Sequence, residues 1–174
     1  MKSFAIGLIF GVIVVFVCVF AYFAGGFAPV ATAAAPMPME RMLARRALHA
    51  RIDREMPKSA SIPADEANYV AGAKIYRDNC AVCHGLPGQP ESNISKGMFP
   101  DAPQLFKHGV TDDPAGETYW KVTNGIRLTG MPGFRNTLSE TERWQVSLLL
   151  ADADKLPQRV KDSLAAAAPV QRMD

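Results

Sequence analysis

The sequence predicts a chain built from helices, and three observations support that prediction. The first is an apolar run from Phe4 to Ala24, close to the ~20 residues that a helix needs to cross a bilayer. The second is a basic segment, residues 39–55, in which apolar residues recur at helical spacing. The third is a pair of helical segments with start signals on either side of the motif Cys80-Ala81-Val82-Cys83-His84.

The motif C-x-x-C-H at residues 80–84 is typical of covalent attachment of a c-type haem. Two thiols about one helical turn apart can bond the two vinyl groups of one porphyrin, and the following imidazole then points at the iron. A Cys-x-x-Cys pair alone also occurs in zinc sites and thioredoxin-like redox sites, and these alternatives stay open for Cys80 and Cys83. His84 favours haem. The single motif predicts one covalently attached haem c.

The apolar N-terminal run predicts a transmembrane helix over residues 1–24 that acts as an uncleaved anchor. No charged residue lies between Ser3 and Met39, and a cleavable signal peptide usually has a shorter apolar core of about 7–15 residues. Ala31-Thr32-Ala33 and Ala33-Ala34-Ala35 are nevertheless plausible cleavage sites. Because haem is attached outside the cytoplasm, we expect the main domain on the extracytoplasmic (periplasmic) side of the cell membrane.

Residues 25–63 are predicted to link the anchor to the main domain. Gly25 to Pro38 is rich in Gly, Pro and Ala and is typical of a flexible exit from the membrane. Residues 39–55 are predicted to form a basic amphipathic helix that lies on anionic lipid or docks on a partner subunit. The alternative is a spacer helix, in solvent or packed on the main domain. The expected apolar face consists of Leu43, Ala47, Leu48 and Ile52.

The main domain is predicted to span residues 64–156, followed by a C-terminal tail, residues 157–174. The run from Val160 to Ala167 can add a helical turn or two to the tail, or the tail can be mobile. The net charge of +2 is too small to indicate nucleic-acid binding. We therefore expect no nucleic-acid partner.

Gly72 stands inside the first predicted helix of the domain, which opens at Ala64-Asp65-Glu66 and runs to Cys80. A glycine there costs about 1 kcal/mol relative to alanine, which indicates a close crossing by another helix. The candidate is the segment 138–154, which opens with a capping box, and we expect Trp144 to fill the gap. The alternative is that Gly72 is merely tolerated.

A long loop, residues 86–116, follows the motif and is unusually long for a compact domain. Wrapping a large apolar haem would account for its length. Within it, Pro103 can offer its carbonyl to the imidazole of His84 and so fix the orientation of the ring. Leu105 and Phe106 would then line the pocket.

The segment after the next predicted helix, which ends at Asn124-Gly125, supplies a candidate sixth ligand. Glycines around Met131-Pro132 let the backbone approach a haem closely and hold the methionine in a rigid turn. The thioether of Met131 is the predicted ligand. Its rivals are Met98 and His108, both in the long loop, and we expect Met98 on the proximal half of that loop.

Taken in order, these motifs resemble a class I (mitochondrial or bacterial type) cytochrome c. The resemblance covers residues 65–156 and rests on CAVCHG, A-P-Q-L, Y-W-x-V-x-N-G-I, T-G-M-P-G-F and a capped helix with W-Q-V. It implies a small all-α fold whose first and last helices cross near the haem edge. It also implies that Cys80 and Cys83 form two thioether bonds to the haem. The axial ligands would be His84 and Met131, and Pro103 would accept a hydrogen bond from the imidazole.

Filled axial positions predict one-electron transfer rather than catalysis, because substrate would first have to displace the methionine. The hypothesis is a membrane-anchored monohaem cytochrome of a respiratory or related chain, with no catalytic residue. It acts as a tethered carrier for redox partner proteins or as a subunit of a larger membrane oxidoreductase. Arg127 is a candidate partner for a haem propionate, or faces solvent. The alternative function is a peroxidase-like enzyme or gas sensor with a labile Met ligand.

Overall fold

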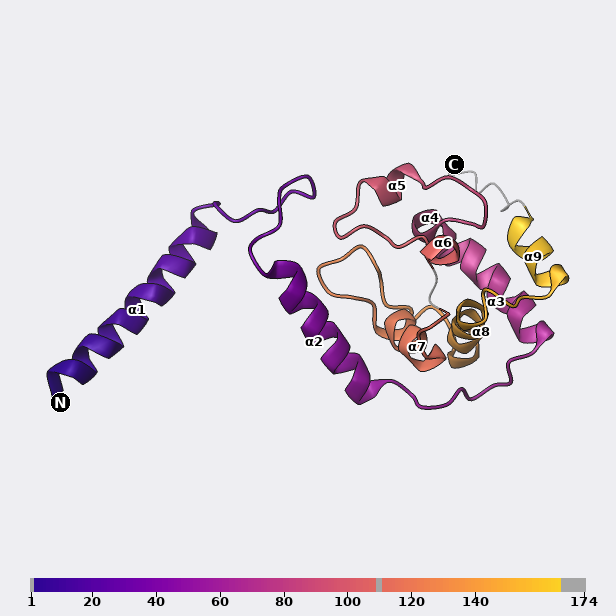
Figure 1. Cartoon of the computed structure of the whole chain (residues 1–174), viewed down its shortest axis with the longest axis horizontal. Coiled ribbons are helices and arrows are strands. Elements are labelled where there is room, and N and C mark those ends of the chain that lie inside the picture. The colour runs from indigo at the N-terminus through magenta and orange to yellow at the C-terminus, as the bar shows by residue number, and fades with distance from the viewer. Residues whose placement is uncertain (1, 109–110, 167–174) are drawn as a thin grey trace. The chain divides into compact units, whose positions relative to one another are not determined.

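The computed structural model describes residues 2–108 and 111–166, and within these ranges the regular structure is entirely α-helical (Figure 1). The predicted all-α fold is therefore confirmed. The chain divides into two compact units, the first ending at Leu43 and the second beginning at Ala44. The helices are α1 (Lys2–Ala24), α2 (Glu40–Glu55), α3 (Glu66–Asn79), α4 (Ala81–His84), α5 (Asn93–Lys96), α6 (Leu105–His108), α7 (Ala115–Asn124), α8 (Glu140–Ala151) and α9 (Gln158–Ala165).

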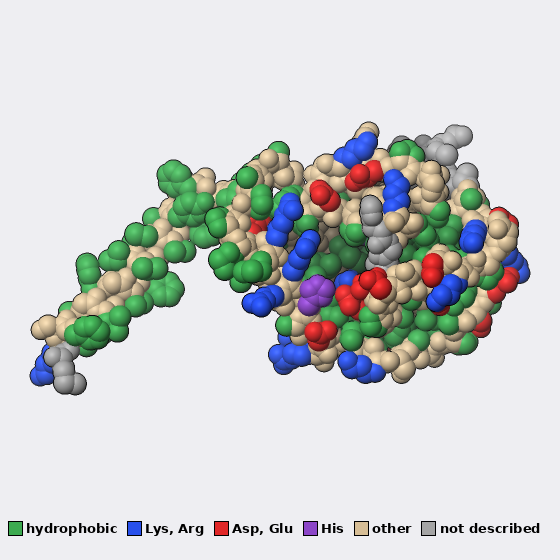
Figure 2. Space-filling view, in the orientation of Figure 1, with side chains coloured by type: hydrophobic (Ala, Val, Ile, Leu, Met, Phe, Trp, Pro, Cys, Tyr) green, Lys and Arg blue, Asp and Glu red, His purple; other side chains and the backbone are tan. Residues whose placement is uncertain are grey.

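Helix α1 presents apolar side chains along its whole length, and none of its residues is buried (Figure 2). Its length and composition make it a candidate membrane span. An N-terminal signal sequence would have the same properties. The helix is thus consistent with the predicted anchor.

Helix α2 is attached to the second unit at its C-terminal end. Ile52 is fully buried, and Trp120 of α7 donates from Nε1 to a carboxylate oxygen of Glu55 at 3.1 Å. The rest of the expected apolar face is not buried as one stripe, since Leu48 is half-buried and Leu43 is exposed. This end of α2 therefore packs on the main domain, while basic side chains line the helix face visible in Figure 2.

Helices α3 and α8 cross at Gly72, as the sequence predicts. A Cβ built on Gly72 would run into the carbonyl oxygen of Gln145 and would lie 3.2 Å from Cβ of Leu149. The expectation that Trp144 fills this gap is wrong. Since Gln145 turns its backbone to α3, the preceding side chain points about 100° away, and Trp144 stacks on Tyr119 of α7 with ring centroids 4.1 Å apart.

The tail contributes to the core. Helix α9 lies beside α3 (Figure 1), and Val160 and Leu164, one turn apart on α9, are buried in the core cluster that includes Tyr76. Arg77 of α3 donates to the carbonyl oxygen of Ala166 at 3.1 Å. Residues 158–166 thus belong to the folded unit, and residues 167–174 lie outside the described part of the chain.

The long loop is not structureless. It contains the single-turn helices α5 and α6, and it ends where α7 begins at Ala115. Ser92 caps α5 by accepting a hydrogen bond from the backbone N–H of Ser95 at 3.1 Å. These short elements place the loop beside α4 and the core.

Candidate functional site

The Cys-x-x-Cys-His motif follows α3 directly and forms the single turn α4. Cys80 and Cys83 are free thiols, each half-buried. Burial, together with a smaller contribution from the neighbouring Cys83, raises the pKa of Cys80 to about 12. A reactive dithiol needs a lowered thiol pKa. The raised pKa of Cys80 therefore does not favour a thioredoxin-like redox site.

A zinc site also finds no support around the motif. Structural zinc usually has four Cys or His ligands, and catalytic zinc has three protein ligands. Within the described residues, no three His, Cys, Asp or Glu side chains are grouped closely enough to hold a metal ion. Two thiols beside one imidazole instead match the donors that attach and ligate a haem.

The imidazole of His84 is oriented by the loop. Its Nδ1 lies 2.8 Å from the carbonyl oxygen of Pro103. With the proton on Nδ1, this nitrogen donates to the carbonyl, and Nε2 keeps a lone pair for a metal. Burial lowers the pKa of His84, and the bond to Pro103 opposes that effect. The ring is therefore neutral near neutral pH, which is the form that binds iron.

Two further side chains hold the turn that carries His84, and sequence reasoning did not assign them a role. The hydroxyl of buried Tyr76 donates to the carbonyl oxygen of Gly85 at 2.7 Å. The amide of Gln104 donates to the carbonyl oxygen of Cys83 and to the hydroxyl of Ser95, each at 3.2 Å. The only feature of the sequence that pointed to Gln104 was its position directly after Pro103.

The predicted lining residues lie beside this network. Leu105 is buried in the core cluster, and Phe106 packs partly buried against the same cluster. The ring of Phe106 meets Tyr76 edge-on, with centroids 5.1 Å apart. Leu105 and Phe106 therefore connect the loop to the helix that leads into the motif.

Met131 is half-buried against the same core cluster as Cys80. The Oγ1 of Thr129 accepts a hydrogen bond from the backbone N–H of Met131 at 3.1 Å and donates to the carbonyl oxygen of Ile126 at 2.7 Å. Sequence reasoning missed Thr129, although a threonine two residues before a turn residue is a known local signal. The hydroxyl closes the turn and fixes the backbone that presents the thioether.

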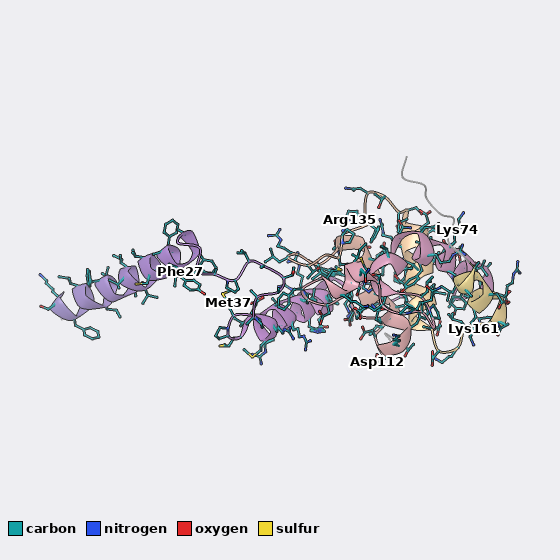
Figure 3. The ribbon with its side chains drawn as sticks, turned by 90° about the horizontal axis from the view of Figure 1, so that it is seen from above. Phe27, Met37, Lys74, Asp112, Arg135 and Lys161 are labelled. Carbon is teal, nitrogen blue, oxygen red and sulfur yellow. The ribbon has the colours of Figure 1, made fainter. Side chains whose placement is uncertain are left out.

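The end of α7 packs tightly against this turn. Gly125 has φ +67°, and a Cβ there would lie 2.8 Å from the carbonyl oxygen of Met131. Only glycine satisfies both conditions. Beyond the turn, Arg135, which is labelled in Figure 3, donates to the side-chain oxygen of Asn124 at 2.8 Å and ties the segment back to α7.

The remaining sequence candidates are the alternative sixth ligands, Met98 and His108, and the possible propionate partner, Arg127. The Cε methyl of Met98 lies where a Cβ built on Gly130 would stand. It therefore lies beside the Met131 turn. The side chain of His108 lies outside the described residues. Arg127 is exposed at the start of the turn.

Among the described residues of the second unit, three large apolar side chains are exposed, and each lies on or beside one of these segments. Val82 stands between the two cysteines and is 53% exposed, and Ile94 of α5 is 57% exposed. Leu128 of the Met131 turn is 92% exposed and has φ +60°. Such a backbone conformation is unusual for a bulky residue.

These features together describe an all-helical domain that carries two thiols and an oriented imidazole in one turn, and a thioether in a second, closed turn. The profile of the family described as cytochrome c oxidase, cbb3-type, subunit III, matches residues 67–148. Cytochrome c6 of Limnospira maxima is 30% identical over 82 residues, which are 47% of this chain and 89% of that protein. Cytochrome c6 of Leptolyngbya boryana is 32% identical over 89 residues, or 49% of this chain and 93% of that protein. The chain belongs to the class I cytochrome c family, which implies covalent haem c and electron transfer.

Two further similarities involve larger proteins. The thiosulfate dehydrogenase of Thiomonas intermedia (strain K12) is 31% identical over 109 residues, or 60% of this chain. The match spans only 33% of that protein. A solved chain of a reducing HAO-like protein complex from Kuenenia stuttgartiensis aligns with a TM-score of 0.44 at 26% identity, covering 51% of this chain and 44% of that one.

Proposed function

We propose that this chain is a membrane-anchored monohaem cytochrome that carries single electrons in a respiratory or related chain. The observation that supports this most directly is the bond from His84 to Pro103, because it leaves Nε2 free to ligate on one side. Met131, in its closed turn, supplies a thioether for the other side. Haem ligated by His and Met supplies reversible one-electron chemistry at a raised potential.

The chain's residues have distinct roles in this proposal. Cys80 and Cys83 form the thioether bonds, and the raised pKa of Cys80 no longer matters once its sulfur is alkylated. Pro103 fixes the imidazole, as outer partners of metal ligands commonly do. In this proposal Leu105 and Phe106 supply apolar surface at the pocket, and the exposed Arg127 would bind a propionate from the solvent side.

The exposed apolar residues mark the proposed docking surface for a redox partner. Single exposed hydrophobic residues are ordinary, but Val82 lies within the haem motif, Ile94 in the neighbouring α5 and Leu128 in the Met131 turn. Ser92 links two of these segments by donating to the carbonyl oxygen of Val82 at 2.6 Å. A partner docked there would lie beside Cys83, which would hold the haem through the second thioether bond.

The membrane part of the proposal is that α1 remains as an anchor and the second unit lies on the periplasmic side. The chain then acts as a tethered carrier or as a subunit of a larger oxidoreductase. The similarity to part of a thiosulfate dehydrogenase supports association with an enzyme. A haem-stained protein from native membranes whose N-terminus begins near Ala34 would overturn the anchor. Migration of the haem band alone in mild detergent would favour the tethered carrier.

The function is tested on the purified full chain by its haem content and visible spectrum. We expect one haem per chain, a ferric spectrum with the weak red-end band of methionine ligation, and no ready binding of CO to the reduced form. Absence of covalent haem would overturn the whole proposal. Ready CO binding without the methionine band would instead support the peroxidase-like or gas-sensing alternative.

A further inference from the structure

Met98 covers the backbone just before the proposed sixth ligand. A Cβ built on Gly130 would run into the Cε methyl of Met98 and would lie 3.5 Å from its Sδ. Gly130 directly precedes Met131 in the chain. The space that a side chain at Gly130 would take is therefore filled by the tip of a side chain from the long loop.

The segment that carries Met98 is fastened to the haem motif. Ser92 Oγ donates to the carbonyl oxygen of Val82 at 2.6 Å, and the amide of Gln104 bonds both Cys83 and Ser95. The backbone N–H of Met98 then donates to the carbonyl oxygen of Ser95 at 3.0 Å. The position of Met98 is thus set from the side of the site that carries His84.

The described hydrogen bonds and close backbone approaches of residues 126–133 come from this turn itself and from α7, and Met131 also packs against the core cluster. Thr129 closes the turn from within, and Gly125 meets the backbone at Met131 from the end of α7. Met98 contacts the turn at Gly130 from a different segment. Methionine suits this place, because its flexible, polarisable side chain fills irregular gaps.

We propose that Met98 is a positioning residue for the sixth ligand, which holds the Met131 turn against the site through its contact with Gly130. This inference rests on the proposed function, in which Met131 ligates the iron. The contact joins the His84 side of the site to the Met131 side. Hydrogen bonds to the haem motif hold the segment that carries Met98, and Met98 contacts the Met131 turn. Loss of the contact lets the turn move away and exposes the sixth position more often.

The first test is imidazole binding to the ferric holoprotein, since an outside ligand must displace Met131. The substitution Met98→Ala should tighten apparent imidazole binding about tenfold, equivalent to ~1.4 kcal/mol of lost ligation. Met98→Leu conserves most of the volume but lacks Cε, so it should tighten imidazole binding less than Met98→Ala does. The matched control is Met56→Ala, because Met56 is another half-buried methionine, directly after α2, and its removal should leave imidazole binding unchanged.

A second test uses the close approach itself and remains informative where Met98→Ala fails to take up haem. Gly130→Ala adds a Cβ that collides with the Cε methyl of Met98, so it should tighten imidazole binding by a smaller factor. Leucine lacks the Cε atom. In the Met98→Leu background, Gly130→Ala should therefore have little effect, which makes the two changes non-additive. Equal effects of Gly130→Ala in both backgrounds would overturn the proposed contact.

The outcomes separate this inference from the function on which it rests. If Met98→Ala binds imidazole like wild type while Met131→Ala loses the methionine spectrum, Met98 has no positioning role and the proposed function stands. If Met98→Leu loses that spectrum while Met131→Ala keeps it, Met98 is itself the ligand. That result would overturn both the positioning role and the ligand assignment.

Discussion

The two halves of the proposed haem site are held in different ways. On the His84 side, a buried tyrosine hydroxyl, the Gln104 amide and the Pro103 carbonyl all bond the turn or its imidazole. On the Met131 side, the turn is held by its own threonine and by close backbone approaches. Leu128, beside it, projects almost fully into solvent.

This difference indicates which ligand is the more easily lost. The Tyr76 hydrogen bond on the His84 side is buried, and a buried hydrogen bond is costly to break because it leaves an unsatisfied polar group. A surface turn can open locally at a much lower free energy than the whole domain. We therefore expect changes on the His84 side to affect folding and haem uptake, and changes on the Met131 side to affect ligation alone.

Removal of the two ligands should give the largest contrast. His84→Gly should yield no stable holoprotein, whereas Met131→Ala should keep covalent haem with a lowered potential and an open sixth position. Haem staining, redox titration and CO binding measure the two cases. An unchanged visible spectrum for Met131→Ala would remove Met131 as the ligand and end the comparison.

Crowding the helix crossing should weaken both halves together. Gly72→Ala places a Cβ against the backbone of Gln145, and overpacking of this kind costs about 1–3 kcal/mol of unfolding free energy. Urea unfolding of the holoprotein measures it as a lowered midpoint at constant slope. Gly97→Ala is the control, because its Cβ would lie at ordinary distances of 3.6 Å or more. Equal midpoints for the two variants would refute the tight crossing.

Removal of one hydroxyl from each half tests the comparison directly. Tyr76→Phe leaves the carbonyl of Gly85 without its buried donor and should cost about 1–3 kcal/mol of unfolding free energy, with the spectrum unchanged. Thr129→Val should cost about 1 kcal/mol, seen as tighter imidazole binding rather than as a lowered unfolding midpoint. Tighter imidazole binding for Tyr76→Phe, together with a lowered unfolding midpoint for Thr129→Val, would contradict the proposed difference between the two halves.

The smallest expected effect is a pH dependence at the start of α8, which lies outside both halves. Hydrogen bonds from Ser139 hold the pKa of Glu142 below its ordinary value. A depressed carboxyl pKa adds stability above the unfolded value of about 4.3 and loses it as pH falls through the folded value. Glu142→Gln should therefore narrow the difference between unfolding midpoints at pH 7 and pH 3. Because the carboxylate is solvent-exposed, that change is small.

Local patterns predicted the elements with a short-range cause. The capping box of Ser139 and Glu142 is present in α8, and α7 ends at Asn124 before a left-handed glycine, as the sequence indicates. The crossing at Gly72 was also predictable, because a glycine inside a helix requires a reason. The nature of its neighbour was not, since the choice between Trp144 and Gln145 depends on the rotation of α8 about its axis.

By itself, the sequence determined the chemistry of the site, because two thiols, an imidazole and their spacing lie within one helical turn. It also determined the helical character and the apolar N-terminal run, which depend on neighbouring residues. Only the tertiary structure decided that α9 completes the core, that Gln104 and Tyr76 hold the motif, and that Met98 lies against Gly130. These contacts join segments far apart in the chain, or depend on how the backbone turns between them, and no local pattern of residue types records either.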